Sequence, residues 1–418
     1  MHNKITDIEP VKLQDSLMTH EKSYDSTYTG LIANYAADIR MSAIKEMAML
    51  SAQLGDVASL TWGLPSFRTP EYIRHGIIKQ LADDEDIGKY ALPDGLKDLR
   101  SIVARQHRLS VGVDVEADDQ VMITAGNMQA MSSLLHAIVN PGDEIILTDP
   151  CFSSHIQQVK LYGGKPVYWP LDEANDWVPD MDVLSTLVSD NTKAIVIVSP
   201  SNPTGKIFGQ QTLMAIGELA RERGFLILID DPYSYFLYEN RQKYFNLASV
   251  PEFSENTVYM FSFSKAYAMS GWRLGYMILP AWLKAQIIKI HDLNMICTPR
   301  ISQVAAKIAL TGEPYHIKEF EAIFARRRAL ICQRLDNMPD IFGYIKPQGA
   351  YYVFPKIRVK HNNAHDFCLD VLYQAKVALT PGSAFGPSGE GHVRMAYCVS
   401  DETINMAFDR LENYFAGI

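Results

Sequence analysis

Between about residues 118 and 280, short apolar runs alternate with helical stretches such as Gln211 to Arg223. The apolar runs are continuous, rich in β-branched residues, and cover 121–124, 144–147, 194–198, 225–229 and 257–261. Such runs indicate strands buried on both faces, and strands separated by helices indicate a mainly parallel sheet. Ligands of these sheets bind at the carboxyl ends of the strands. We therefore predict an α/β fold whose functional residues lie just after its strands.

Composition narrows the class of protein. The 418 residues suffice for one large domain and a smaller companion. The net charge of -9 and the lack of a long basic run argue against nucleic-acid binding. No apolar segment approaches a membrane span and the amino terminus does not resemble a signal peptide, so we expect no membrane association and a cytoplasmic location. Five widely spaced cysteines favour reduced thiols over disulfides or zinc.

The segment from Ser262 to Tyr276 follows the last apolar run and contains Lys265 and Arg273. A buried amine near another cation has a lowered pKa, so Lys265 is a candidate nucleophile toward a carbonyl group. The guanidinium of Arg273 could hold a phosphate. A cofactor that carries a carbonyl group and a phosphate would therefore use both Lys265 and Arg273. The alternative is an exposed lysine on a polar loop.

Other strand ends carry motifs of their own. Residues 124–130 open a helix, whose unpaired backbone N–H groups form a phosphate cradle. The third strand ends in the turn Ser199 to Gly205, and the fourth ends in Asp230-Asp231-Pro232-Tyr233. Near the carboxyl terminus, Arg394 stands in an apolar strand, where a buried charge needs a partner.

In their order along the chain, these motifs resemble those of the class I/II aminotransferases, which are fold type I pyridoxal 5'-phosphate (PLP) enzymes. The resemblance covers roughly residues 35–415. It implies a large domain with a mainly parallel seven-stranded sheet flanked by helices, and a smaller α+β domain. The implied division is an amino-terminal arm (1–35), a small domain (36–70 and 300–418) and a large PLP-binding domain (71–299).

The resemblance also implies catalytic roles. Lys265 would form a Schiff base with PLP and later move the proton of the substrate α-carbon. Asp230 would pair with the pyridine nitrogen, which makes the ring an electron sink, and Asp231 is the competing candidate. Tyr233 and Asn202 would donate hydrogen bonds to the phenolic oxygen of the ring.

The phosphate group would be held by residues from two strand ends. Gly126, Asn127 and Met128 would form the cradle, with the Asn127 side chain as a further candidate donor. Ser262 and Arg273 would complete it. A glycine before a helix is also common as a simple turn.

The resemblance also implies roles toward the ring, the partner subunit and the substrate for five residues. Phe152 would stack on the pyridine ring, or else be a core phenylalanine. Tyr90 would reach the phosphate in the partner subunit, which implies a homodimer with shared active sites; alternatively it packs on its own subunit. Gly63, Asn202 and Arg394 would contact the substrate, with Arg394 binding its α-carboxylate. The alternatives are an ordinary turn for Gly63 and a structural ion pair for Arg394.

The implied function is a PLP-dependent aminotransferase that moves an amino group from an amino acid to a 2-oxo acid. A PLP-dependent lyase, cyclase or oxidase of the same fold is the alternative. A PLP-binding transcription regulator would need a basic DNA-binding domain, for which residues 1–35 are too short. A nicotinamide-dependent enzyme would need a Gly-x-Gly-x-x-Gly motif after its first strand, and this sequence has none there, which argues against that class.

Two positions bear on substrate and metal. Aspartate-specific members carry an additional arginine where Asp292 or Leu293 stands here, so a neutral or cationic substrate side chain is expected at least as much as a dicarboxylate.

His361 and His365 are expected to be surface residues, because asparagines stand between them and no further ligand follows. No metal site is predicted.

Overall fold

The computed structural model describes residues 30–33, 35–36, 39, 41–238 and 244–417. The chain divides into two compact units, Met1–Arg40 and Met41–Ile418. The predicted amino-terminal arm, residues 1–35, lies almost entirely outside the described residues. The architecture below is that of the second unit.

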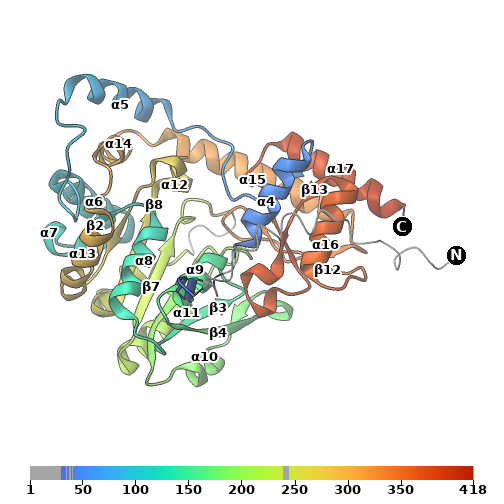
Figure 1. Ribbon diagram of the computed structural model, residues 1–418, viewed down its shortest axis with the longest axis horizontal. Helices are drawn as coiled ribbons and strands as arrows, with labels where there is room; N and C mark the ends of the chain where they lie inside the picture. Colours follow the sequence, from blue (N-terminus) through green and yellow to red (C-terminus); the bar gives the residue numbers. More distant parts are fainter. Residues whose placement is uncertain (1–29, 34, 37–38, 40, 239–243, 418) are drawn as a thin grey trace. The chain divides into compact units, whose positions relative to one another are not determined.

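An eight-stranded sheet forms the centre of this unit (Figure 1). Six strands run in one direction, β9 runs antiparallel between β2 and β8, and β5 runs antiparallel to β4 at the other edge. The spatial order is β2 (Val121–Thr124), β9 (Gly275–Ile278), β8 (Thr257–Ser262), β7 (Leu226–Asp231), β6 (Thr192–Ile197), β3 (Glu144–Asp149), β4 (Lys165–Asp172), β5 (Val178–Pro179). The sheet has one strand more than the seven predicted, and β5 has only two residues.

The five strands predicted from apolar runs are confirmed as β2, β3, β6, β7 and β8. Every residue of β2, β7 and β8 is buried, which explains why these runs are continuous rather than alternating. The helices that pack on the sheet are α6 (Lys97–Val111), α8 (Asn127–Ile138), α9 (Ser153–Leu161), α10 (Met181–Leu187) and α11 (Gln210–Arg223). Around them lie α5 (Glu71–Asp83), α7 (Ala117–Gln120), α13 (Ala281–Met295) and α14 (Arg300–Thr311).

Segments from both ends of the second unit form smaller sheets. The pairs are β1 (Ala58–Ser59) with β13 (Val377–Ala378), β10 (Phe342–Gly343) with β12 (Lys356–Ile357), and the order β11 (Tyr352–Val353), β15 (Val393–Ala396), β14 (Thr380–Pro381). The helices of this region are α4 (Ala43–Leu54), α15 (Tyr315–Asp336), α16 (Ala364–Asp370) and α17 (Asp401–Ala416). In Figure 1, α4 (blue) lies among these carboxyl-terminal elements (orange and red). Since Met41–Ile418 forms one compact unit, the boundary between a small and a large domain stays a prediction.

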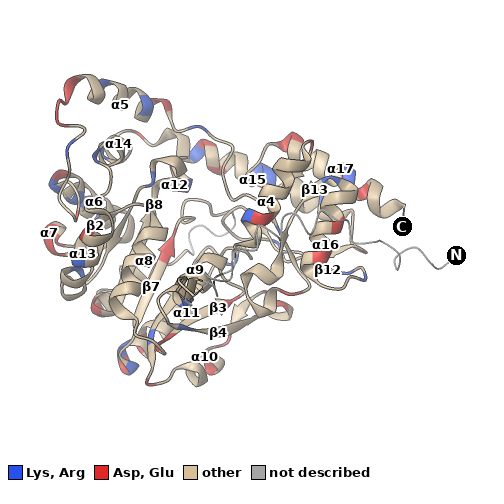
Figure 2. Ribbon diagram, in the orientation of Figure 1, with Lys and Arg blue, Asp and Glu red and all other residues tan. Residues whose placement is uncertain are grey.

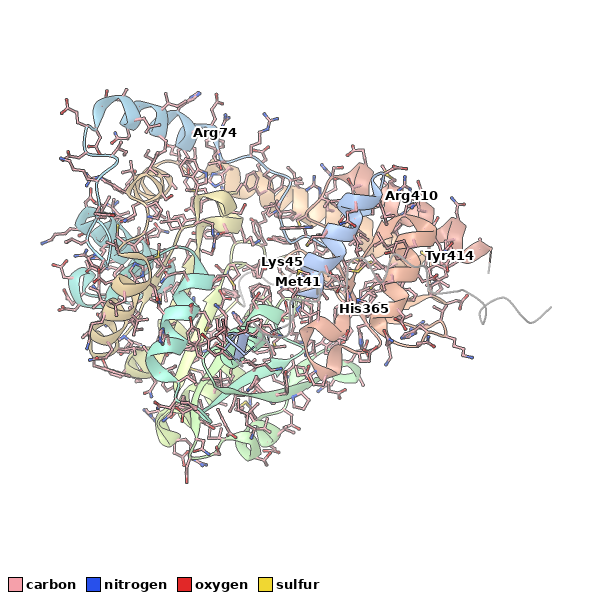
Figure 3. All side chains as sticks on the ribbon, in the orientation of Figure 1. Met41, Lys45, Arg74, His365, Arg410 and Tyr414 are labelled. Carbon is pink, nitrogen blue, oxygen red and sulfur yellow. The ribbon has the colours of Figure 1, made fainter. Side chains whose placement is uncertain are left out.

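Polar side chains connect the helices of this region. His365 Nε2 on α16 lies 3.2 Å from Glu46 Oε1 on α4. The hydroxyl of Tyr414 on α17 donates to Asp370 Oδ2 at 2.5 Å. Figure 3 labels His365 and Tyr414 in this region, with Arg410 on the same helix as Tyr414. His365 therefore has a carboxylate partner within the protein.

Charged residues lie mainly on helices and loops (Figure 2), as expected because burying a charge is costly. The end of β7 is an exception, since Asp230 and Asp231 are 5% and 1% exposed. No helix in the described ranges is long and apolar enough to span a membrane. Two adjacent buried carboxylates at a strand end require partners, and these partners define the site described next.

Candidate active site

Most of the predicted site residues lie at or near the carboxyl ends of the main-sheet strands, where open α/β sheets bind their ligands. Gly126 follows β2, Phe152 follows β3, Asn202 follows β6, Asp230 is the second-last residue of β7 and Lys265 follows β8. The strand order therefore brings together residues that are far apart in the sequence.

Lys265 lies in the short helix α12 (Phe263–Ala266), directly after β8. Its Nζ donates a hydrogen bond of 2.5 Å to the carbonyl oxygen of Gly63. Burial lowers the pKa of the Lys265 amine to about 8, and the charges of Arg394 and Arg273 act in the same direction. Near pH 8 about half of such amines are neutral. Lys265 thus has the nucleophilic form that addition to a carbonyl group needs.

Asp230 is held by two side chains. His155 Nε2 lies 3.0 Å from Asp230 Oδ2, and Asn127 Nδ2 donates to Asp230 Oδ1 at 2.6 Å. Asn127 Nδ2 also donates to the carbonyl of Met260 at 3.2 Å. The Asn127 side chain is thus directed to Asp230, where the sequence analysis named it as a further donor to the phosphate. The reason is that a carboxylate is a strong acceptor for an amide N–H.

Asp231 points to the opposite face of the strand, as neighbouring residues in a strand do. Its Oδ2 accepts from the hydroxyl of Tyr259 at 2.7 Å, and its Oδ1 accepts from the backbone N–H of Ser234 at 2.9 Å. Burial raises the pKa of Asp231 to about 6. Asp230, and not Asp231, is therefore the acid that shares a face with His155 and Asn127.

Gly126 and Arg273 meet at the start of α8. Gly126 adopts a φ of 79°, and a Cβ there would lie 2.8 Å from Arg273 Nη2. Glycine therefore lets the guanidinium approach the helix start. Arg273 donates to the carbonyls of Ser270 (2.9 Å) and Ala125 (3.2 Å), so within the described residues its charge meets neutral acceptors only. A cation beside a helix amino terminus is suited to bind an anion.

Ser262 and Gly126 lie on either side of Gly275. In the sheet register Gly275 pairs with both Ser262 and Thr124, and a Cβ on Gly275 would lie 3.2 Å from Gly126 Cα. Ser262 caps α12 by accepting a hydrogen bond from the N–H of Ser264. Met128, in the first turn of α8, is 40% exposed. The residues predicted to cradle a phosphate therefore come from adjacent strand ends.

Arg394 on β15 is only 1% exposed. Nη1 donates to Asn202 Oδ1 at 3.1 Å, Nη2 donates to the carbonyl of Thr61, and Nε is buried without a partner. The guanidinium carbon lies 4.6 Å from the ring centre of Tyr352 and 5.0 Å from that of Phe385. In the described part of the chain no carboxylate pairs with Arg394. Since an unpaired buried charge is costly, the residue is suited to receive an anion.

Tyr233 and Phe152 each contact another residue of the site, Tyr233 through Tyr352 and Phe152 through His155. The hydroxyl of Tyr233 is 3.0 Å from that of Tyr352, and Tyr233 is 4% exposed. The Phe152 ring is perpendicular to the ring of His155, with 5.2 Å between their centres. Phe152 therefore lies next to the residue that holds Asp230.

Gly63 and Tyr90 differ in their surroundings. A Cβ on Gly63 would lie 1.9 Å from the Tyr352 hydroxyl, so a side chain there would displace Tyr352. Tyr90 is 76% exposed, and among the described residues no hydrogen bond or ring contact joins it to the residues above. Its predicted role in a partner subunit stays a prediction.

Sequence reasoning missed His155 and Tyr352. His155 stands three residues after Phe152 on α9, so the two side chains share a helix face, and this spacing could have pointed to it. Tyr352 lies on β11, and the sequence analysis did not name it. Its contacts with Tyr233 and Arg394 depend on tertiary structure alone.

The residue set fits PLP and its substrate. An amine, a held carboxylate and two guanidinium groups without carboxylate partners match the aldehyde, ring nitrogen and phosphate of the cofactor and the α-carboxylate of an amino acid. Within the described ranges no three His, Cys, Asp or Glu side chains gather closely enough to hold a metal ion. His361 Nδ1 lies 2.9 Å from the carbonyl of Val359.

Comparison with known proteins gives the family. The model of the family "Aminotransferase class I and II" matches residues 56–411. An aspartate aminotransferase of Pyrococcus abyssi and an aromatic-amino-acid aminotransferase of Thermococcus litoralis are each 34% identical over 90% of this chain and 95% of their own. The structure of the Thermus thermophilus aspartate aminotransferase with maleate is 29% identical and covers 92% of this chain and 99% of its own, with a TM-score of 0.87.

The chain belongs to the class I and II aminotransferase family, and its fold is the fold type I architecture of these enzymes. It is therefore an enzyme of that family, whose members use PLP to move amino groups between amino acids and oxo acids.

Proposed function

We propose that the protein binds PLP at Lys265 and transfers the amino group of an amino acid to a 2-oxo acid. The observation that most directly supports this proposal is the arrangement of charges in the site. The charges of Arg394 and Arg273 both help to lower the pKa of Lys265, and neither guanidinium has a carboxylate partner in the described ranges. A phosphate and a substrate carboxylate would supply the two missing anions.

The roles of the residues follow from their positions. When bound, PLP supplies an electron sink for negative charge at the substrate α-carbon. Asp230, fixed by His155 and Asn127, keeps a proton on the ring nitrogen. Tyr233 and the amide of Asn202 donate to the phenolic oxygen. The amine of Lys265 takes the proton from the α-carbon and returns it, as a general base and then a general acid.

Anion binding divides between the two arginines. Arg273, Ser262 and the backbone of residues 126–128 hold the phosphate. Arg394 holds the substrate α-carboxylate, and its bond to Asn202 places that carboxylate near the cofactor ring. Gly63, whose carbonyl oxygen accepts a hydrogen bond from Lys265, would contact the substrate.

We further propose a homodimer in which Tyr90 reaches the phosphate of the partner subunit. The exposure of Tyr90 (76%) and of the neighbouring Leu92 (61%) supports this, since large side chains at these levels of exposure mark a surface suited to a partner. All five cysteines are free thiols, which supports a cytoplasmic location.

The amino donor is proposed to carry a neutral or cationic side chain. Asp292 and Leu293 lie in the last turn of α13, and neither offers a cation for a distal carboxylate. The relatives named as aspartate and aromatic-amino-acid aminotransferases make aspartate, phenylalanine and tyrosine the first donors to compare.

The purified protein is expected to show visible absorption from bound cofactor. Borohydride should abolish this absorption and leave the cofactor attached to Lys265, as peptide mass mapping would show. Amino acids of the correct class should bleach the visible band with release of a 2-oxo acid, and a second 2-oxo acid should restore it. Release of ammonia, or consumption of oxygen, without this reversible exchange would instead assign a lyase, cyclase or oxidase.

Arg394→Met is expected to weaken the use of the amino donor without lowering the stability of the protein. The value of kcat/KM for the amino donor should fall by about two to three orders of magnitude, because the carboxylate loses a charge-assisted partner. The melting temperature should stay equal or rise, since a buried guanidinium without a carboxylate is replaced by an apolar side chain. Steady-state kinetics and calorimetry measure the two effects. An unchanged KM and kcat would remove Arg394 from the site.

A further inference from the structure

Tyr352 joins parts of the site that come from different strands. It lies on β11, where it pairs with Ala396 of β15. Arg394 stands two residues before Ala396, so it lies on the same face of this small sheet as Tyr352. This register places the Arg394 guanidinium over the Tyr352 ring, 4.6 Å from its centre.

The other end of the Tyr352 side chain meets Tyr233. The two hydroxyl oxygens are 3.0 Å apart, and the two rings are nearly perpendicular. Tyr352 is 2% exposed, and its hydroxyl lies so close to Gly63 that any side chain at position 63 would collide with it. The hydroxyl is therefore confined to a position beside Tyr233.

We propose that Tyr352 is a positioning residue with two separable tasks: its hydroxyl orients and strengthens the donor Tyr233, and its ring supports Arg394. The inference rests on the proposed function, in which Tyr233 donates to the phenolic oxygen of PLP and Arg394 binds the substrate carboxylate.

The direction of the hydrogen bonds explains how the Tyr352 hydroxyl can strengthen Tyr233 as a donor. When the Tyr233 hydroxyl donates its hydrogen bond to the phenolic oxygen, the Tyr233 oxygen can accept a hydrogen bond from the Tyr352 hydroxyl. A donor to that oxygen makes the Tyr233 O–H group a stronger donor, because hydrogen bonds in a chain polarise one another. Tyr352 thus adds to the stabilisation of negative charge on the phenolic oxygen without touching it.

The second task depends on the ring alone. A guanidinium over an aromatic face is attracted to it, and the contact is stronger where water is excluded. With Asn202 and Thr61 holding its nitrogens, the ring fixes the plane of the Arg394 guanidinium. The plane matters because a bidentate carboxylate must lie in it.

Two variants separate these tasks in the intact, cofactor-loaded protein. Tyr352→Phe keeps the ring, so the KM for the best amino donor of the panel should stay within about twofold of wild type, since the contact of the ring face with Arg394 is retained. The midpoint of a pH titration of the visible absorption should rise by a few tenths of a pH unit, because Tyr233 becomes a weaker donor. Tyr352→Leu should show the same rise and, in addition, a KM raised severalfold.

Two controls test whether the shift passes through Tyr233. Tyr397→Phe removes another buried hydroxyl, which donates to the carbonyl of Ala350 at 3.4 Å, and should leave midpoint and KM unchanged. In a Tyr233→Phe background, adding Tyr352→Phe should produce no further shift, since coupled residues are not additive.

A Tyr352→Phe protein that binds cofactor and titrates like wild type would overturn the inference and leave the proposed function intact. An additive shift in the double variant would also overturn it, because the effect would then bypass Tyr233. If the wild-type protein itself shows no cofactor absorption, the proposed function fails and the inference fails with it. A Tyr352→Leu protein whose titration midpoint and KM both match those of wild type would overturn the inference as well.

Discussion

Lys265→Ala is expected to lose transamination by at least about 10⁴-fold, because in the proposed function one residue supplies both the covalent attachment and the proton transfer. The visible absorption that borohydride removes from the wild-type protein should be absent or shifted in the variant. Lys265→Arg should be equally inactive, since arginine keeps the charge but does not lose its proton. Steady-state rates and absorbance spectra measure both effects.

Lys206 offers a matched control. Burial lowers the pKa of its amine as well, and the residue follows the same turn as Asn202. Lys206→Ala should keep activity within severalfold, because a lowered pKa without the neighbouring arginines and Asp230 does not make a catalytic lysine. Substantial activity in Lys265→Ala would contradict the assignment directly.

Asp230→Ala is expected to lower kcat by about 10²- to 10³-fold or more, because in the proposed function the ring nitrogen would lose its charged partner. Asp230→Asn should fall nearly as far, since it keeps the shape but not the charge. Both variants should also lose stability, because Asp230 is a buried acceptor for Asn127, so activity is compared at a temperature at which each variant stays folded. Single-turnover kinetics with the best amino donor would show the loss in the chemical step.

Asp231→Asn provides the comparison at the neighbouring position. It should keep activity within about tenfold and lose stability, because Asp231 is a buried acceptor for Tyr259 and Ser234. If Asp231→Asn is the inactive variant and Asp230→Asn is active, the assignment of the ring partner is reversed.

The strands that sequence predicted are those buried on both faces, because only these produce continuous apolar runs. β4 was not predicted, and the sequence explains why: it contains Pro166 and Pro170 and has only partial burial, both unusual for an inner strand. β9 was not predicted either, since its four residues begin at Gly275 and directly follow the lysine segment.

The site shows a similar division. Lys265 and Asn202 follow strands, and Asp230 is the second-last residue of β7. These three residues could be named from the sequence, because the strand ends of a parallel sheet meet at one edge. The bond of His155 to Asp230 and the bond of Tyr352 to Tyr233 join segments that no local pattern connects. The choice of Asp230 over Asp231 rested on resemblance, and the structure adds the opposite directions of the two carboxylates.

The guanidinium groups of Arg273 and Arg394 bear on the lifetime of the protein in the cell. A folded chain whose cations lack counter-ions gains stability from any ligand that brings them, and the unfolded chain gains nothing comparable. Cofactor supply would then govern abundance as well as activity, because molecules synthesised when PLP is scarce would unfold more often and meet proteases sooner.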